Sequence, residues 1–316
     1  MIRFVVRRLL WTLPVLWVAA TLVWIFMFLI PGDPARILAG QSASPERLEA
    51  VRATWGLDDP PPLRYVRFMG MVARGDLGTS YVQSRPVSAI VAEAMGRTFV
   101  LALVATALAA AAGLLLGLGA SVRRGGPVDH AVRGFSSLAV SLPTFWVGMM
   151  LMLLFASRLG WLPVSGYGDG PVILGFRLPS VAHLVLPSLT LALFSCGYVA
   201  RVARAELLEE KERGYVRAVT ARGAGPLRSL GGHALSNALV PVVTLVGLNF
   251  GWLLGGAVVT ETVFNWPGIG TAILRGLNNR DLPVVEGAAI VLTASFLLVN
   301  LAVDLVCGWL DPRARL

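Results

Sequence analysis

The chain of 316 residues is 56% hydrophobic, and 14% of its residues are charged, whereas a soluble domain carries about 25% charged residues. Such a small number of charged residues cannot cover the surface of a water-soluble protein of this size. The composition therefore excludes an ordinary soluble enzyme, a disordered chain and a collagen-like fibre. Together with a mean hydropathy of +0.71, it predicts a polytopic membrane protein. The net charge of +9 is then a sign of membrane topology and of attraction to the lipid bilayer, and nucleic-acid binding is not expected.

Six apolar runs, each near the roughly 20 residues that a spanning helix needs, predict an all-α protein with six transmembrane helices. In chain order the runs cover residues 9–30, 98–121, 135–157, 184–200, 239–260 and 286–309. The first run is longer than the apolar core of a signal peptide, so we expect an uncleaved span. The fourth run is the shortest and contains Pro187.

These runs divide the chain into three parts. Residues 1–31 form the N-terminal tail and first span, residues 32–97 an extracytoplasmic loop region, and residues 98–316 a five-helix core with a large cytoplasmic loop at 201–238. In the loop region, Ser44 as N-cap and Pro45 in the first turn predict a short helix. Three prolines at 60–62 then predict a chain break.

Basic residues indicate the orientation of the spans. Six spans place both termini on one side, and 15 of the Lys and Arg residues would lie on that side against 12 on the other. Eight of those 12 lie in the first loop, which is too long to follow the positive-inside rule. The remaining count of 15 against 4 predicts that both termini are cytoplasmic.

Motifs of catalytic chemistry are missing from the sequence. No phosphate-binding Gly-x-x-x-x-Gly-Lys-Ser/Thr occurs, and the single lysine, Lys211, follows two glutamates. No Gly-x-Ser-x-Gly nucleophile motif occurs either. The three histidines and two cysteines lack the spacing of metal ligands. We therefore expect no catalytic residue, metal site or cofactor in this chain.

Small residues repeat every four positions in two of the spans. The stripes comprise Ala105, Ala109, Gly113 and Gly117 in the second span, and Gly247, Gly251 and Gly255 in the fifth. This spacing places the small residues on one helix face and lets two backbones approach closely. The stripes predict tight helix packing, and a face that slides or lines a pathway is the alternative.

Few polar side chains interrupt the spans. The candidates for a translocation path are Asn249, Asn300 and Asp304 within the spans and Glu261 at a span end. Ionisable groups inside a membrane are candidates for function because burying them is costly. For Asp304, close to the inner end of the last span, an interfacial ion pair is the alternative.

The loop after the fourth span carries the most specific motif. It reads Tyr-Val-Arg-Ala-Val-Thr-Ala-Arg-Gly-Ala-Gly-Pro-Leu at 215–227 and His-Ala-Leu-Ser-Asn-Ala-Leu-Val-Pro at 233–241. This resembles the cytoplasmic EAA loop of permease subunits in bacterial ABC importers. Ala218, Gly223 and Leu235 match the general pattern, and its Glu, second Ala, Ile and Pro are replaced in the way that is typical of the dipeptide, oligopeptide and nickel branch.

Further blocks resemble that branch along essentially the whole chain. They are residues 75–80, 143–146, 162–168, 255–264, 266–268, 280–283 and 310–313. The long first loop favours the B-type permease over its C-type partner.

The resemblance implies a type I ABC importer permease fold in the bacterial inner membrane. It implies a heterodimer with a C-type permease subunit, two ATP-binding subunits that bind ATP and Mg, and an extracytoplasmic binding protein that delivers di- or oligopeptides. Nickel or glutathione import is the alternative within the family. A stand-alone secondary carrier or channel, which would show inverted hydropathy repeats, is the alternative outside it.

The resemblance also assigns coupling with the ATP-binding subunits to the EAA-like loop. The residues expected to make this contact are Tyr215, Arg217, Ala218, Arg222, Gly223, Ala224, Gly225, Pro226 and Leu227. The residues themselves predict a basic helix over 215–222, a sharp break, and a second short helix that begins at Pro226. Because the fifth span follows this loop, we expect its glycine stripe to press against a span of the partner permease.

Overall fold

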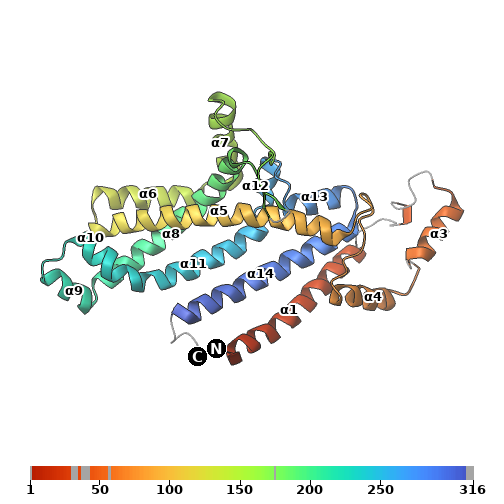
Figure 1. Ribbon diagram of the computed structural model, residues 1–316, viewed down its shortest axis with the longest axis horizontal. Coiled ribbons are helices and arrows are strands. Elements are labelled where there is room, and N and C mark those ends of the chain that lie inside the picture. The colour runs from red at the N-terminus through yellow and green to blue at the C-terminus, as the bar shows by residue number, and fades with distance from the viewer. Residues whose placement is uncertain (1, 30–34, 37–42, 56–57, 174–175, 311–316) are drawn as a thin grey trace.

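The computed structural model describes residues 2–29, 35–36, 43–55, 58–173 and 176–310 (Figure 1). The predicted boundary at residues 31 and 32, and the end of the last matching block at 311–313, lie outside these ranges. The described part of the chain is mostly helical, as the composition predicts.

Five long helices pack against one another along the long axis of the molecule (Figure 1). They are α1 (Ile2–Leu29), α5 (Val87–Val122), α8 (Val181–Lys211), α11 (Leu235–Gly256) and α14 (Leu282–Leu310). The shorter elements are α3 (Pro45–Trp55), α4 (Pro61–Ala73), α6 (Pro127–Ser141), α7 (Thr144–Leu151), α9 (Gly214–Ala221), α10 (Pro226–Ser229), α12 (Val258–Val263), α13 (Ile269–Asn278), the π-helical turns η1 (Met152–Arg158) and η2 (Leu230–Ala234), and the antiparallel strands β1 (Val172–Ile173) and β2 (Phe176–Arg177).

Fewer candidate spans are identified than the six predicted. By length and composition, four helical stretches of the described chain could cross a membrane: Val87–Val122, Val181–Lys211, Leu227–Gly256 and Leu282–Gly308. The pair Pro127–Ser141 and Thr144–Arg158 forms a fifth if it is counted as one bent span. In α1, the apolar stretch Leu10–Phe26 is shorter than these.

Several helices extend beyond the predicted apolar runs, because hydropathy detects the membrane-spanning part of a helix rather than the whole helix. α5 begins at Val87, well before residue 98, and includes the charged Glu93 and Arg97. α8 continues to Lys211, so the span predicted to be the shortest belongs to a helix of 31 residues, with Pro187 inside it.

The third predicted span is not a single helix. α6 ends at Ser141, and the chain resumes as α7 after a bend of 104°. Leu142 before Pro143 has a ψ angle of 134°, in the extended region that a following proline favours. The conformational restriction imposed by Pro143 therefore accounts for the break between α6 and α7, which the continuous apolar run does not reveal.

The first loop contains two helices, α3 and α4. The predicted cap of α3 is confirmed, because the Arg47 N–H donates to Ser44 Oγ at 3.4 Å. The predicted chain break at residues 60–62 coincides with the boundary between α3 and α4: Pro60 is the N-cap of α4, and the next two prolines occupy its first turn. Proline suits that turn because the N–H groups there have no helical partner.

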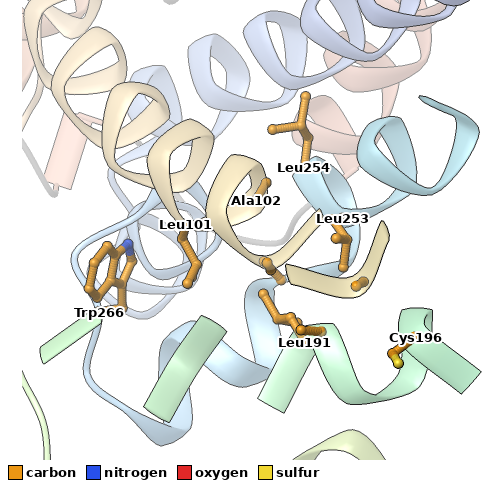
Figure 2. Close-up of a cluster of buried hydrophobic side chains, with 11 residues drawn as sticks. Leu101, Ala102, Leu191, Cys196, Leu253, Leu254 and Trp266 are labelled. Atoms are coloured by element: carbon orange, nitrogen blue, oxygen red, sulfur yellow. The ribbon is translucent and has the colours of Figure 1, made fainter. Parts of the chain in front are cut away.

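α5 and α8 form the centre of the fold, and their contact is the most extensive in the molecule. Figure 2 shows the main buried cluster, in which Leu101 and Ala102 of α5 lie near Leu191 of α8 and Leu253 of α11. Trp266, from the loop before α13, closes this cluster and is fully buried. The core therefore joins α5, α8 and α11, and α9 and α10 lie between the last two of these along the chain.

Candidate functional site

The predicted helix–break–helix of the EAA-like loop is confirmed. α9 covers Gly214–Ala221, a turn follows, and α10 begins at Pro226. Figure 1 shows α9 and α10 at one end of the molecule, whereas α3 and α4 lie at the other. We call residues 212–229 the coupling segment.

One buried side chain of α9, Val216, packs against the neighbouring helices. Val216 is 1% exposed and belongs to a cluster with Leu207 of α8 and Leu230 and Ala234 of η2. Leu118 of α5 packs against the same cluster. Sequence reasoning did not single out Val216, although it is the apolar position between the polar Tyr215 and Arg217. It therefore packs α9 against α8, η2 and α5.

Polar contacts fix the direction of α9. The Tyr215 hydroxyl donates to Glu210 at the end of α8 and accepts a hydrogen bond of 2.8 Å from Asn237 Nδ2 in α11. Arg217 pairs with Glu212, and Arg213 with Glu209 at 3.1 Å. Burial, followed by the bond to Glu210, raises the pKa of Tyr215, so the phenol remains protonated and able to donate. Asn237 was not predicted to take part.

The other side of the coupling segment is exposed. Ala218, Arg222 and Gly225 are exposed, and Leu227 has 65% of its surface accessible. Ala224 is half-buried. The segment thus presents small, basic and apolar groups away from the helices that hold it.

Gly223 shapes the turn between α9 and α10. Its φ angle is +92°, in the region that L side chains rarely adopt, and its N–H donates to the Thr220 carbonyl at 2.9 Å. A Cβ atom there would meet no heavy atom within 4 Å. The requirement for glycine is therefore one of backbone conformation rather than of space.

The glycine stripe of α5 lies against α8. A Cβ on Gly113 would fall 2.7 Å from Val199 Cβ, and a Cβ on Gly117 would fall 2.7 Å from Ala203 Cβ. Real Cβ atoms do not approach so closely, so the two helices touch only because these positions lack side chains.

The stripe of α11 faces α14 of the same chain. A Cβ on Gly247 would lie 2.3 Å from Val303, and one on Gly251 would lie 3.3 Å from Asn300 Oδ1. The expected contact with the partner permease is therefore wrong at these two positions. Around Gly255 a Cβ would meet nothing within 4 Å. Helical spacing shows which residues share a helix face, but it does not show which helix packs against that face.

Glu261 lies in a closed polar cluster. It is fully buried and accepts hydrogen bonds from Thr98 Oγ1 at 2.5 Å and from the Thr271 N–H at 3.1 Å. Thr98 Oγ1 in turn accepts the Ile269 N–H at 2.8 Å. A Cβ on Gly268 would overlap the carboxylate. In this structure Glu261 caps the N-terminus of α13 and ties it to α5.

The other pathway candidates lie on α11 and α14. Asn249 and Asn300 are half-buried, and their Nδ2 and Oδ1 atoms respectively are buried without a hydrogen-bond partner among the described residues. Asp304 is half-buried one turn after Asn300. Asn249, Asn300 and Asp304 thus lie on α11 and α14, whereas Glu261 is held by α5 and α13.

Two contacts that sequence reasoning missed hold the helices beside the coupling segment. Arg204 of α8 forms a two-pronged ion pair with the buried Asp129 of α6, with Nη2 and Oδ2 2.8 Å apart. Lys211 Nζ lies 3.1 Å from the Val122 carbonyl at the end of α5, where a cation suits the helix dipole. In the sequence both cations had counted only as topology signals.

At the opposite end of the molecule, two of the matching blocks meet. The buried Asp281 accepts hydrogen bonds from Ser80 Oγ at 2.5 Å and from the Tyr81 N–H at 2.9 Å. The loop before α5 is thereby joined to the start of α14. Within the described residues, no group of three or more His, Cys, Asp or Glu side chains could hold a metal ion.

Comparison with known families accounts for almost the whole chain. Residues 109–316 match the family described as "Binding-protein-dependent transport system inner membrane component", and residues 1–102 match the corresponding N-terminal family. The chain belongs to this family. It is therefore a multi-pass inner-membrane permease of a binding-protein-dependent ABC importer, a system that implies ATPase and binding-protein partners, and it is not itself an enzyme.

Relatives that match along their full length support this family assignment. The chain is 38% identical over 315 residues to a Brucella abortus permease protein named for peptide transport, covering 100% of this chain and 99% of the relative. It is 37% identical over 315 residues, with the same coverage, to the glutathione transport system permease protein GsiC of Pectobacterium atrosepticum. A Sinorhizobium fredii permease protein named for peptide ABC transport is 36% identical over 312 residues, 99% of each chain.

A solved structure supports the fold. The MetNI methionine ABC transporter in an inward-facing conformation contains a chain that matches with a TM-score of 0.58 and 18% identity, covering 70% of this chain and 96% of that one. The fold is therefore that of an ABC transporter permease. Membership of the importer family leaves the stand-alone carrier or channel without support.

Proposed function

We propose that this chain is the B-type permease of an importer for di- or oligopeptides. The observation that carries the proposal is the end-to-end similarity to relatives whose names assign them to peptide transport. Glutathione is the second candidate substrate, because GsiC is similar over the same length. Glutathione is itself a tripeptide, so the two substrates share their chemistry.

Uptake experiments separate these substrates. Cells that lack their own peptide importers would express the chain with its partner subunits and binding protein. We expect saturable uptake of radiolabelled trialanine, with excess glutathione competing weakly. Uptake of glutathione without trialanine would replace the proposal by the second candidate.

We further propose six spans with both termini in the cytoplasm. α1 and the bent α6–α7 pair supply the two spans beyond the four long apolar stretches. Support comes from α1 and α14, which pack together in opposite directions, so that the start of α1 lies on the same side as the end of α14 (Figure 1). The excess of basic residues on that side agrees.

The coupling segment is proposed to dock into an ATP-binding subunit. That subunit and a second copy would bind ATP and Mg, and a C-type permease would complete the heterodimer. The face with Ala218, Arg222 and Leu227 supports this role, since all three residues are exposed. Closure of the ATP-binding subunits would move α9, and Val216 and Tyr215 would pass that movement to α8, α5 and α11.

Cysteine labelling tests the orientation. Glu49 in α3 and Arg228 in α10 are both exposed and lie at opposite ends of the molecule. With Cys196 and Cys307 replaced by alanine, Glu49→Cys should react with a membrane-impermeant maleimide in intact cells, and Arg228→Cys only after permeabilisation. The reverse pattern would invert the topology.

A further inference from the structure

The helix α4, in the first loop, has two different exposed stripes. Val66, Met69 and Ala73 follow helical spacing and form an apolar stripe, in which Val66 has 65% of its surface accessible, Ala73 is exposed and Met69 is half-buried. Arg67 and Arg74, two turns apart, form a basic stripe beside it; both are exposed, and Arg67 pairs with Asp59. The side of α4 between Phe68, which is buried, and Tyr65 faces the rest of the protein.

Tyr65 places α4 against the apolar part of α1. Its hydroxyl lies 2.7 Å from Thr21 Oγ1, and its ring meets the ring of Trp24 edge to face at 5.3 Å. Both residues belong to the apolar stretch Leu10–Phe26 of α1. At a rise of about 1.5 Å per residue, Thr21 lies roughly 7 Å inside the end of that stretch.

This contact sets the depth of α4 relative to a membrane. The neighbouring surface of α1 is strongly apolar and exposed, with Leu22 48% and Phe26 62% accessible, and it belongs to the apolar stretch that suits the interior of a bilayer. A helix held beside that surface by Tyr65 lies at the edge of the same lipid layer. Tyr65 and Trp24 are also the aromatic types that collect at this boundary.

We propose that α4 is an interfacial helix that binds the phospholipid headgroup layer of the bilayer. Its apolar stripe continues the exposed apolar surface of α1, and its basic stripe, in which Arg67 also pairs with Asp59, meets the phosphates. The first loop is then bound to the membrane surface along α4. Its other parts, α3 and residues 75–86, remain in water, where they can contact soluble proteins.

Two neighbouring side chains provide a matched test. Val66 and Arg67 are both exposed, but they point about 100° apart around the helix. Each would be replaced by cysteine in a full chain carrying Cys196→Ala and Cys307→Ala, and labelled with an environment-sensitive fluorophore. The chain would be reconstituted in phosphatidylethanolamine and phosphatidylglycerol vesicles. Leu22→Cys on α1 gives the reference signal of a lipid-facing side chain.

Quenching then reports what each position faces. Lipids that carry a nitroxide near the headgroup should quench the probe of Val66→Cys about twofold more than that of Arg67→Cys, and aqueous iodide should show the opposite order. Equal iodide quenching at both positions, with no effect of the nitroxide, would place α4 in water and overturn the proposal. Protection of Val66→Cys from both quenchers would indicate a protein partner on this stripe and would overturn it equally.

Discussion

Asn237, in the first turn of α11, donates a hydrogen bond of 2.8 Å to the hydroxyl of Tyr215 at the start of α9. The same hydroxyl donates to Glu210 at the end of α8. One side chain therefore joins the helix that enters the coupling segment, the segment itself and the helix that leaves it.

Removing the Tyr215 hydroxyl should loosen this junction. Tyr215→Phe is expected to retain ATP hydrolysis by the assembled importer but to lower the transport obtained per ATP, with a stability loss of about 1 kcal/mol. Parallel measurements of ATPase activity and peptide uptake in proteoliposomes check this. The double variant Tyr215→Phe with Asn237→Ala should be little worse than Tyr215→Phe alone; additive losses would show that the two residues act separately.

Gly223 should be more sensitive than Gly225 although both are exposed. Gly223→Ala forces a side chain into a positive φ at a cost of about 1 kcal/mol or more, and it should impair coupling. A Cβ on Gly225 meets nothing within 4 Å and Gly225 is not among the positive-φ residues, so Gly225→Ala should be mild. Transport assays on the two variants give the comparison, and equal activities would refute the role of the turn.

The α11–α14 contact should depend on Gly247 and not on Gly255. Gly247→Ala places a methyl group against Val303 and should destabilise the chain by about 1–3 kcal/mol, seen as a lower melting temperature in detergent. Gly255→Ala has open space and should change little. Adding Val303→Ala should restore part of the loss in the first variant; failure of that rescue would mean that the strain arises elsewhere.

The ion pair between Asp129 and Arg204 should affect the stability of the fold because Asp129 is buried. Asp129→Ala leaves the guanidinium without its carboxylate partner and should cost about 3 kcal/mol. Replacing both residues, by Asp129→Leu with Arg204→Met, should recover much of this, because no uncompensated charge remains. Melting temperatures of the three proteins test the account, which fails if the double variant is the least stable.

Local chemistry explains what the sequence could predict. The Ser44 cap, the turn at Gly223 and the start of α10 at Pro226 depend on a few adjacent residues, and all three are present. Hydropathy likewise located the long helices, but it missed their polar extensions, because Glu93 and Arg97 continue α5 beyond the apolar run.

Contacts between distant residues could not be predicted in the same way. Tyr215 and Asn237 are 22 positions apart, and no spacing rule pairs them. The stripe at Gly247 specified close packing, but only the folded chain identifies Val303 as the neighbour. Glu261 appeared to be a membrane carboxylate, and its partner Thr98 comes from another helix.

The central claim is that this chain is a peptide pathway driven through the coupling segment by ATP-binding partners. The most direct measurement is uptake of a labelled tripeptide into proteoliposomes that contain the complete importer, with and without ATP and the binding protein, for the natural chain and for Gly223→Ala. The account predicts uptake that requires both additions and that falls sharply in the variant while ATP is still hydrolysed. Uptake by the chain without ATP, or undiminished uptake by the variant, would contradict it.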